Sequence, residues 1–207
     1  KYLRVPYGLS VYGDEEIQAV VKVLKHSTQM GKNVSEFEKK IAKLFNKKYG
    51  LMVNSGSSAI MLAMEALNLP EGSEVITPAL TFSTTVAYIV KNKLVPVFVD
   101  VEEGTYCIDE SKIKNLITKK TKAIIAPHLM GNIVNWKKLS PLLKKKNILI
   151  LEDSADTLGA TYKGKSTGYY ADISITSFYG SHIINCAGNG GIVCFNNKEL
   201  YLTAKLL

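Results

Sequence analysis

Seven short apolar runs rich in β-branched residues recur along the chain, and they limit its possible folds more than any other feature. They lie at residues 49–53, 74–77, 94–99, 122–126, 148–151, 172–178 and 191–195. Runs of this kind are typical of strands that are buried on both faces. Segments with helical spacing lie before and between them, at 14–26, 34–45, 57–67, 84–91, 109–116 and 136–145. The alternation predicts an α/β fold with three layers, in which crossover helices cover a mostly parallel, doubly wound sheet of about seven strands.

Composition agrees with one globular core. Of the 207 residues, 46% are hydrophobic and 21% are charged, which suits a folded α/β protein. No apolar run reaches the roughly 20 residues that a membrane-spanning helix needs, and no leader with an apolar centre is present. We therefore expect a soluble, cytoplasmic protein without a membrane partner. The three cysteines have neither paired nor metal-type spacing, so we expect no disulfide framework and no metal site.

The net charge of +8 permits nucleic-acid binding. The lysines, however, form scattered clusters at the polar ends or faces of predicted helices, without interleaved aromatic residues. Affinity for a phosphate backbone requires the charges to gather on one surface. We expect solvated faces and no nucleic-acid partner, although an anionic substrate would benefit from the positive field.

Ligands of an open α/β sheet bind beyond the carboxyl ends of its strands, and one glycine–serine turn lies there. Gly56, Ser57 and Ser58 follow the strand that ends at Val53 and begin the next helix. Glycine allows the backbone to approach a ligand closely, and the free amides of a first helical turn bind phosphate. The same turn can also be a simple helix cap, worth about 1 kcal/mol. Both interpretations stay open for this segment by itself.

Two carboxylates end the strand at 148–151, and one of them projects from the sheet edge into the same crevice. Asp153 beside a pyridine nitrogen would keep that nitrogen protonated and make the ring an electron sink. The alternatives for Glu152 and Asp153 are an acidic cap on the next segment or a metal ligand.

Other side chains near predicted strand ends complete a candidate site. Phe82 could stack on a flat ring or fill the core, and Ser177 could give a phosphate a second hydroxyl. We expect His128 to be a polar lining residue. With His182 nearby as a base, a phosphate cradle and a carboxylate for a ring nitrogen are the equipment for holding pyridoxal phosphate.

The order and spacing of short motifs resemble the DegT/DnrJ/EryC1/StrS family of sugar aminotransferases and dehydratases, which have the aspartate-aminotransferase fold. The resemblance covers nearly the whole chain. Its motifs are Thr28-Gln29-Met30-Gly31, Asn54-Ser55-Gly56-Ser57-Ser58-Ala59, Pro96-Val97-Phe98-Val99-Asp100, Gly131-Asn132, Glu152-Asp153, Leu158-Gly159-Ala160-Thr161-Tyr162, Ser177-Phe178-Tyr179 and Gly190-Gly191.

The resemblance implies roles for the candidate residues. Cofactor contacts are expected from Gly56, Ser57, Ser58, Phe82, Asp153, Asp156 and Ser177, and substrate contacts from Gln29, Met30 and Gly31. Most members of the family place a Schiff-base lysine five residues after the serine at position 177, where this chain has His182. A histidine there, with an acid at Asp156 instead of the aminotransferases' glutamine, resembles the nucleotide-sugar 3-dehydratase branch.

Histidine can shuttle protons but cannot form an imine. The resemblance thus implies pyridoxal or pyridoxamine phosphate bound without a covalent link, and dehydration of a nucleotide-linked 4-keto-6-deoxyhexose in deoxysugar and surface-polysaccharide biosynthesis, with His182 as the base. An aminotransferase of the same family and a non-catalytic or regulatory member are the alternatives. The nearest candidates for a cofactor lysine elsewhere, Lys163 and Lys165, lie in a Tyr-Lys-Gly-Lys turn and are expected to face solvent.

The resemblance also implies an amino donor such as glutamate and a homodimer. The nucleotide, CDP or GDP, and the sugar stay open. We expect an N-terminal arm and helix at 1–30 and a cofactor-binding large domain at 31–207. A helix expected from residue 197 runs to the last residue, 207, without a cap, so we also expect a small C-terminal domain to be missing.

Overall fold

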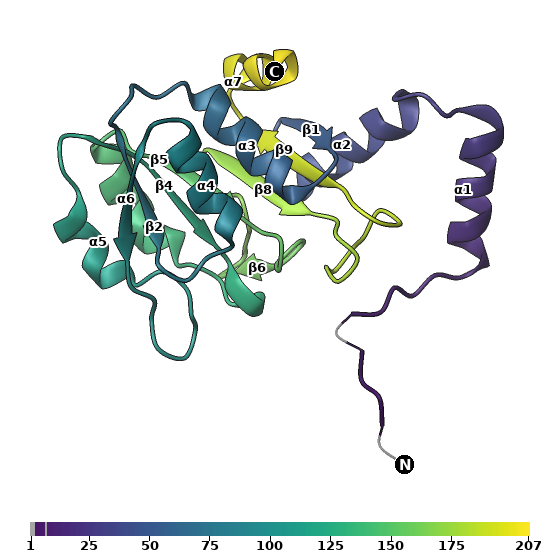
Figure 1. Ribbon diagram of the computed structural model, residues 1–207, viewed down its shortest axis with the longest axis horizontal. Coiled ribbons are helices and arrows are strands. Elements are labelled where there is room, and N and C mark those ends of the chain that lie inside the picture. Colours follow the sequence, from purple (N-terminus) through teal and green to yellow (C-terminus); the bar gives the residue numbers. More distant parts are fainter. Residues whose placement is uncertain (1–2, 7) are drawn as a thin grey trace.

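The computed structural model describes residues 3–6 and 8–207, and a seven-stranded sheet forms its centre (Figure 1). The strands are β1 (Tyr49–Val53), β2 (Glu74–Pro78), β3 (Val95–Val99), β4 (Thr121–Pro127), β5 (Leu149–Asp153), β8 (Ile173–Ser177) and β9 (Gly191–Phe195). Their order across the sheet is β1-β9-β8-β5-β4-β2-β3. Strand β9 runs antiparallel to β1 and β8, and the other neighbouring pairs are parallel. The expected mostly parallel sheet is confirmed.

The helices lie where the apolar spacing predicts them, within one or two residues. They are α1 (Asp14–His26), α2 (Lys32–Leu44), α3 (Gly56–Leu67), α4 (Ser83–Lys91), α5 (Glu110–Leu116), α6 (Trp136–Lys145) and α7 (Lys198–Leu206). A 3-10 turn, η1 (Leu129–Gly131), and a small hairpin, β6 (Thr161–Tyr162) with β7 (Lys165–Ser166), complete the elements.

Each face of the sheet carries its own apolar core. In β4, Ile125 packs with α3, α4 and α7, whereas the preceding Ile124 packs with α5 and α6. Adjacent strand residues point to opposite faces, so an unbroken apolar run can supply both cores. Helix α2 covers β9 and the β1 end of the sheet through Phe45 and Ile41. Full burial of an apolar side chain such as Ile41 or Phe45 stabilises the fold by roughly 1.5–3 kcal/mol.

Helix α1 stands apart from the rest of the molecule at the end of an extended arm (Figure 1). None of its residues is buried, although it carries an apolar stripe that includes Ile17, Val20 and Leu24. Within residues 3–6 and 8–207, no helix has both the length and the apolar character that a bilayer crossing requires.

Candidate active site

A cavity of about 560 Å³ lies beyond the carboxyl ends of β1, β4, β5 and β8. The parallel strands end at one edge of the sheet, so the loops that follow them meet there. Several residues singled out from the sequence line this cavity: Gly56, Ser57, Phe82, Asp153, Asp156, Ser177 and His182.

The first turn of α3 forms one wall and provides donors for an anion. The Ser55 hydroxyl caps the helix by accepting the Ser58 N–H at 3.1 Å. The backbone N–H groups of Gly56 and Ser57 have no acceptor within the described part of the chain. Free amides at a helix N-terminus attract a phosphate dianion. The turn is therefore a capped helix start that still has free N–H donors, so the cap and the anion-binding interpretations both apply to it.

Two glycines allow this wall to pack closely against the strands beside it. A Cβ at Gly56 would lie 2.7 Å from the Ser177 Cβ and 3.1 Å from its Oγ, so the hydroxyl at the end of β8 sits next to the helix start. A Cβ at Gly191 would lie 2.3 Å from both the carbonyl carbon and the oxygen of Ser55. The amides of Gly56 and Ser57 and the Ser177 hydroxyl thus lie around a hollow that a side chain would fill, and this donor set fits a phosphate group.

Of the two carboxylates at the end of β5, Asp153 is the one that faces the cavity. Its side chain is buried, and burial raises its pKa to about 6, while the Ala155 N–H that donates to Oδ1 at 3.0 Å opposes the shift. The neighbouring carboxylate of Asp156 raises the pKa further. A buried carboxylate without a cationic partner is costly. The position therefore favours a ligand with a protonated ring nitrogen.

Glu152 points to the opposite side of the sheet edge and pairs with His128. The Val134 N–H donates to His128 Nδ1 at 3.0 Å, which leaves the ring proton on Nε2, 3.2 Å from Glu152 Oε2. The backbone N–H of His128 donates to the Asp153 carbonyl at 2.8 Å. The pair is fully buried and fixes the loop after β4 to the end of β5. His128 also lines the cavity, as expected.

His182 and Asp156 both line the cavity and lie near each other. Asp156 Oδ2 accepts the Met130 N–H at 2.9 Å, and Oδ1 lies 4.0 Å from His182 Nε2. Met130 has a left-handed backbone with φ of 54°, so this carboxylate holds a strained turn in place. The imidazole is 23% exposed and can reach a ligand in the cavity. The arrangement places the His182 imidazole, a possible base, near the Asp156 carboxylate.

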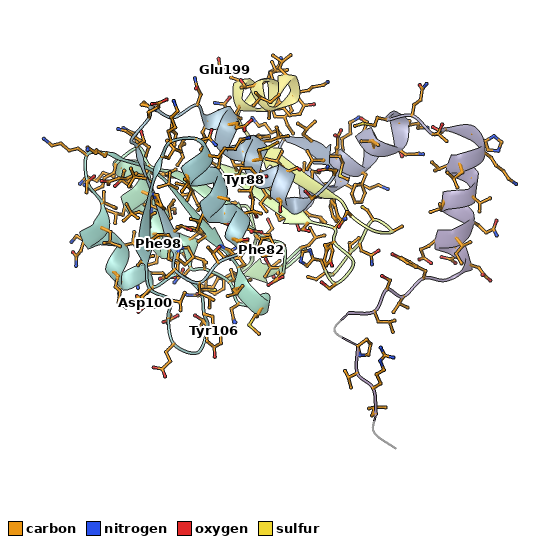
Figure 2. The ribbon with its side chains drawn as sticks, viewed as in Figure 1. Phe82, Tyr88, Phe98, Asp100, Tyr106 and Glu199 are labelled. Carbon is orange, nitrogen blue, oxygen red and sulfur yellow. The ribbon has the colours of Figure 1, made fainter. Side chains whose placement is uncertain are left out.

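Phe82 precedes α4 and borders the cavity (Figure 2). Its side chain is 66% exposed, so it is not part of the core and is available to stack on a flat ligand. On the same helix, the Thr84 hydroxyl lies 3.4 Å from that of Ser57 and extends the polar wall.

Some predicted contacts lie outside the cavity. The Ser58 hydroxyl bonds to Asn54 Oδ1 at 2.6 Å instead of lining the hollow. Gln29, Met30 and Gly31 are exposed between α1 and α2, so their substrate contacts stay a prediction. Lys163 and Lys165 are exposed around the β6–β7 turn, as expected.

Several other lining residues were not among the site residues expected from the sequence. Thr84, Leu129, Tyr179 and Asn189 line the cavity from loops and helix starts. For Thr84 and Leu129 a signal existed, because both lie within three residues of a predicted strand end or of an expected site residue. Asn189 stands directly before the Gly190-Gly191 motif, but its place in the cavity depends on how the loop before β9 folds.

A model of the DegT/DnrJ/EryC1/StrS aminotransferase family matches residues 11–207. The dTDP-4-dehydro-2,6-dideoxy-D-glucose 3-dehydratase of Saccharopolyspora spinosa is 37% identical over 203 residues, which are 94% of this chain and 44% of that relative. The GDP-perosamine synthase of Escherichia coli O157:H7 is 39% identical over 171 residues, 83% of this chain and 47% of that relative. The chain spans about half the length of these curated relatives.

A solved structure extends the match to three dimensions. The E. coli GDP-4-keto-6-deoxy-D-mannose-3-dehydratase with bound hydrated pyridoxal phosphate superposes with a TM-score of 0.91 at 33% identity. The match covers 97% of this chain and 53% of that one. The expected large-domain fold of pyridoxal-phosphate-dependent transferases is confirmed, and so is pyridoxal phosphate as the cofactor of this family.

Proposed function

The chain belongs to the DegT/DnrJ/EryC1/StrS aminotransferase family, and from this premise we propose that the protein is a nucleotide-sugar 3-dehydratase. Its substrate is a nucleotide-linked 4-keto-6-deoxyhexose used in deoxysugar biosynthesis, from which the C3 hydroxyl leaves as water. The cofactor is held without a covalent link to the protein.

The observation that carries this proposal is His182 in the wall of the cavity. By resemblance this position belongs to the lysine that anchors the cofactor. None of the described residues that line the cavity is a lysine. An imidazole cannot form an imine, so it supports proton transfer without a tether.

The residues around the cavity suit the cofactor part by part. The amides of Gly56 and Ser57 with the Ser177 hydroxyl would bind the phosphate, and Phe82 would cover the ring. Asp153 would accept a hydrogen bond from the protonated ring nitrogen, because its carboxylate is buried and forms no ion pair with a lysine or arginine in the described part of the chain. When bound in its amine form, the cofactor supplies an amine that condenses with the C4 ketone of the sugar and a ring that accepts electrons.

His182 would move the proton: its imidazole would take one from the cofactor's methylene carbon. General-base catalysis by a positioned side chain contributes typically 10²–10⁴-fold, about the gain expected of one histidine. The C3 hydroxyl of the sugar would leave as water with the proton that His182 has taken up, while the cofactor ring would accept the electrons. Glutamate would serve as the donor that restores the amine form, and we expect a homodimer.

A product assay with the full-length protein tests this function. The enzyme receives pyridoxamine phosphate and a nucleotide-linked 4-keto-6-deoxyhexose, and mass spectrometry follows the sugar. We expect loss of water, and a His182→Asn variant that still binds cofactor but is slower by roughly 100-fold or more. The matched control is His26→Asn, at the exposed end of α1. Retention of the wild-type rate by His182→Asn would overturn the assignment.

Transamination is the second candidate, because the perosamine synthase relative is as similar as the dehydratase relative. It predicts an amino sugar that keeps its C3 hydroxyl and consumption of one glutamate for each product formed. The same assay therefore separates the two functions.

A further inference from the structure

The N-terminal arm lies against the loop that carries His182. We call residues 8–12 the arm segment and residues 179–189, between β8 and β9, the His182 loop. A Cβ at Gly8 would lie 2.8 Å from the Ser181 Cβ and 3.2 Å from the Ser181 Cα. Ser181 lines the cavity and immediately precedes His182. The arm segment thus supports this wall of the cavity from the outside.

Asn185 connects the two segments through its side-chain amide. The Tyr12 hydroxyl donates to Asn185 Oδ1, and Asn185 Nδ2 donates to the Ser10 hydroxyl at 3.3 Å. The Ala187 N–H donates to the same Oδ1 at 3.2 Å. One side chain therefore joins two arm residues to the middle and the end of the loop.

The His182 loop has few other restraints. Its other described backbone bonds are the His182 N–H to the Tyr179 carbonyl at 3.0 Å, the Cys186 N–H to the Phe178 carbonyl at 3.1 Å and the Tyr179 N–H to the Ser177 hydroxyl at 3.3 Å. Ala187 has a left-handed backbone with φ of 53°, which an alanine adopts at a cost. Contacts from outside the loop are therefore needed to keep it in one conformation.

We propose that Tyr12 and Ser10, acting through Asn185, are positioning residues for His182. This inference rests on the proposed function of His182 as the base. A general base must lie within about 2.6–3.2 Å of the atom that carries the proton. A misplacement of about 1 Å can cost 10²-fold in rate. The phosphate and ring contacts come from α3, β5, β8 and the start of α4, so the arm segment affects the base without affecting cofactor affinity.

Four variants of the full-length protein test this role: Tyr12→Phe, Asn185→Ala, the double variant and Tyr106→Phe. Tyr106 is the matched control, because it lies on the β3–α5 loop (Figure 2) and its hydroxyl has no hydrogen-bond partner among residues 3–6 and 8–207. Three quantities are measured: kcat for water loss, the cofactor dissociation constant, and amide hydrogen exchange of residues 179–189 by mass spectrometry.

We expect Tyr12→Phe to lower kcat by roughly two- to tenfold, the worth of one hydrogen bond, with an unchanged cofactor dissociation constant. Exchange in the His182 loop should become faster in Tyr12→Phe and stay unchanged in Tyr106→Phe. The double variant should be no slower than Asn185→Ala alone, because both changes remove one shared contact.

Additive effects of the two changes, or loop exchange that does not respond to Tyr12→Phe, would overturn the inference. Faster exchange with an unchanged kcat would also overturn it, since the arm segment would then order the loop without placing the base. If the wild-type protein releases no water from the sugar, the proposed function is wrong. The exchange data still decide whether the arm segment holds the loop.

Discussion

At the scale of single residues, the cavity contains a buried carboxylate whose ionised form destabilises the folded chain. Asp153 ends β5 in a buried position, and no lysine or arginine among residues 3–6 and 8–207 forms an ion pair with it. Functional sites commonly keep such groups at a cost in stability. The cost is measurable through its dependence on pH.

Asp153→Asn should stabilise the cofactor-free protein above pH 6 and weaken cofactor binding. Burial raises the pKa of this carboxyl from 3.8 to about 6. The folded protein then binds the proton more tightly than the unfolded chain does, so destabilisation develops as pH rises through this interval. A shift of this size corresponds to on the order of 3 kcal/mol at pH 8.

Urea unfolding of both proteins without cofactor, at pH 4 and at pH 8, measures this effect. The two proteins should differ little at pH 4 and should separate at pH 8. A variant that is equally or less stable at pH 8 would show that the carboxylate is not strained. Fluorescence titration should find weaker cofactor binding, because a neutral amide offers no negative charge to a protonated ring nitrogen.

At the scale of elements, the approach of β9 to the first turn of α3 shapes the phosphate hollow. Gly191→Ala would place a methyl group 2.3 Å from the Ser55 carbonyl carbon, so the turn must move. Overpacking of this kind costs roughly 1–3 kcal/mol. We expect a lower melting temperature and cofactor affinity that is weaker by at least tenfold, measured by calorimetry and titration.

Gly13→Ala is the control for this change, because a Cβ there would meet only the Glu16 carboxylate, at 3.4 Å. If Gly191→Ala lowers stability but leaves cofactor affinity at the wild-type value, the close packing of β9 would not shape the hollow.

A buried lysine in the turn after α2 forms hydrogen bonds with the segment before β8. Lys47 Nζ donates to the Gly168 and Ala171 carbonyls, and burial lowers its pKa to about 8 from 10.5, although Glu152 opposes the shift. The unfolded chain keeps the proton up to pH 10.5, while the folded protein releases it near pH 8. Stability attributable to this residue should therefore rise with pH between about 8 and 10.5.

Lys47→Met keeps the aliphatic stem and removes the ionisable group. The stability of the wild type relative to this variant should rise by up to about 3 kcal/mol across that interval, measured by urea unfolding at pH 7.5 and pH 10. A difference that stays constant with pH would contradict the lowered pKa.

Much of the order of strands and helices could be predicted from the sequence. Strands buried on both faces appear as unbroken apolar runs, whereas helices show helical spacing of apolar residues. β1 and β9 have the bounds that their apolar runs predict. The direction of β9 left no signal, since an apolar run reads the same for parallel and antiparallel pairing. The β6–β7 hairpin has strands of two residues, too short for a period to show.

The site could be predicted in part for a similar reason. Strand alternation requires Glu152 and Asp153 to point to opposite sides, but it does not say which of them faces the ligand. That choice depends on His128 and its contact with Glu152, which is a tertiary feature. Likewise, Ser55 caps α3 and Ser58 bonds to Asn54, a division of roles that the sequence Asn-Ser-Gly-Ser-Ser does not reveal.

At the scale of the whole molecule, the apolar side chains of α1 require a partner surface. Ile17, Val20 and Leu24 are each at least half exposed, and no residue of the helix is buried. Together with the family resemblance, this leads us to expect a homodimer of the full-length protein. Light scattering should give twice the mass of one chain, and a monomer at micromolar concentration would contradict this expectation.

The central claim is that the cofactor is held by its phosphate, ring and ring nitrogen, without a bond to a lysine. Borohydride reduction of the full-length protein loaded with pyridoxal phosphate, followed by peptide mass spectrometry, tests it most directly. We predict no reduced cofactor on any lysine of the wild type, and a reduced adduct at position 182 in the His182→Lys variant. An adduct on a lysine of the wild-type protein would contradict the claim.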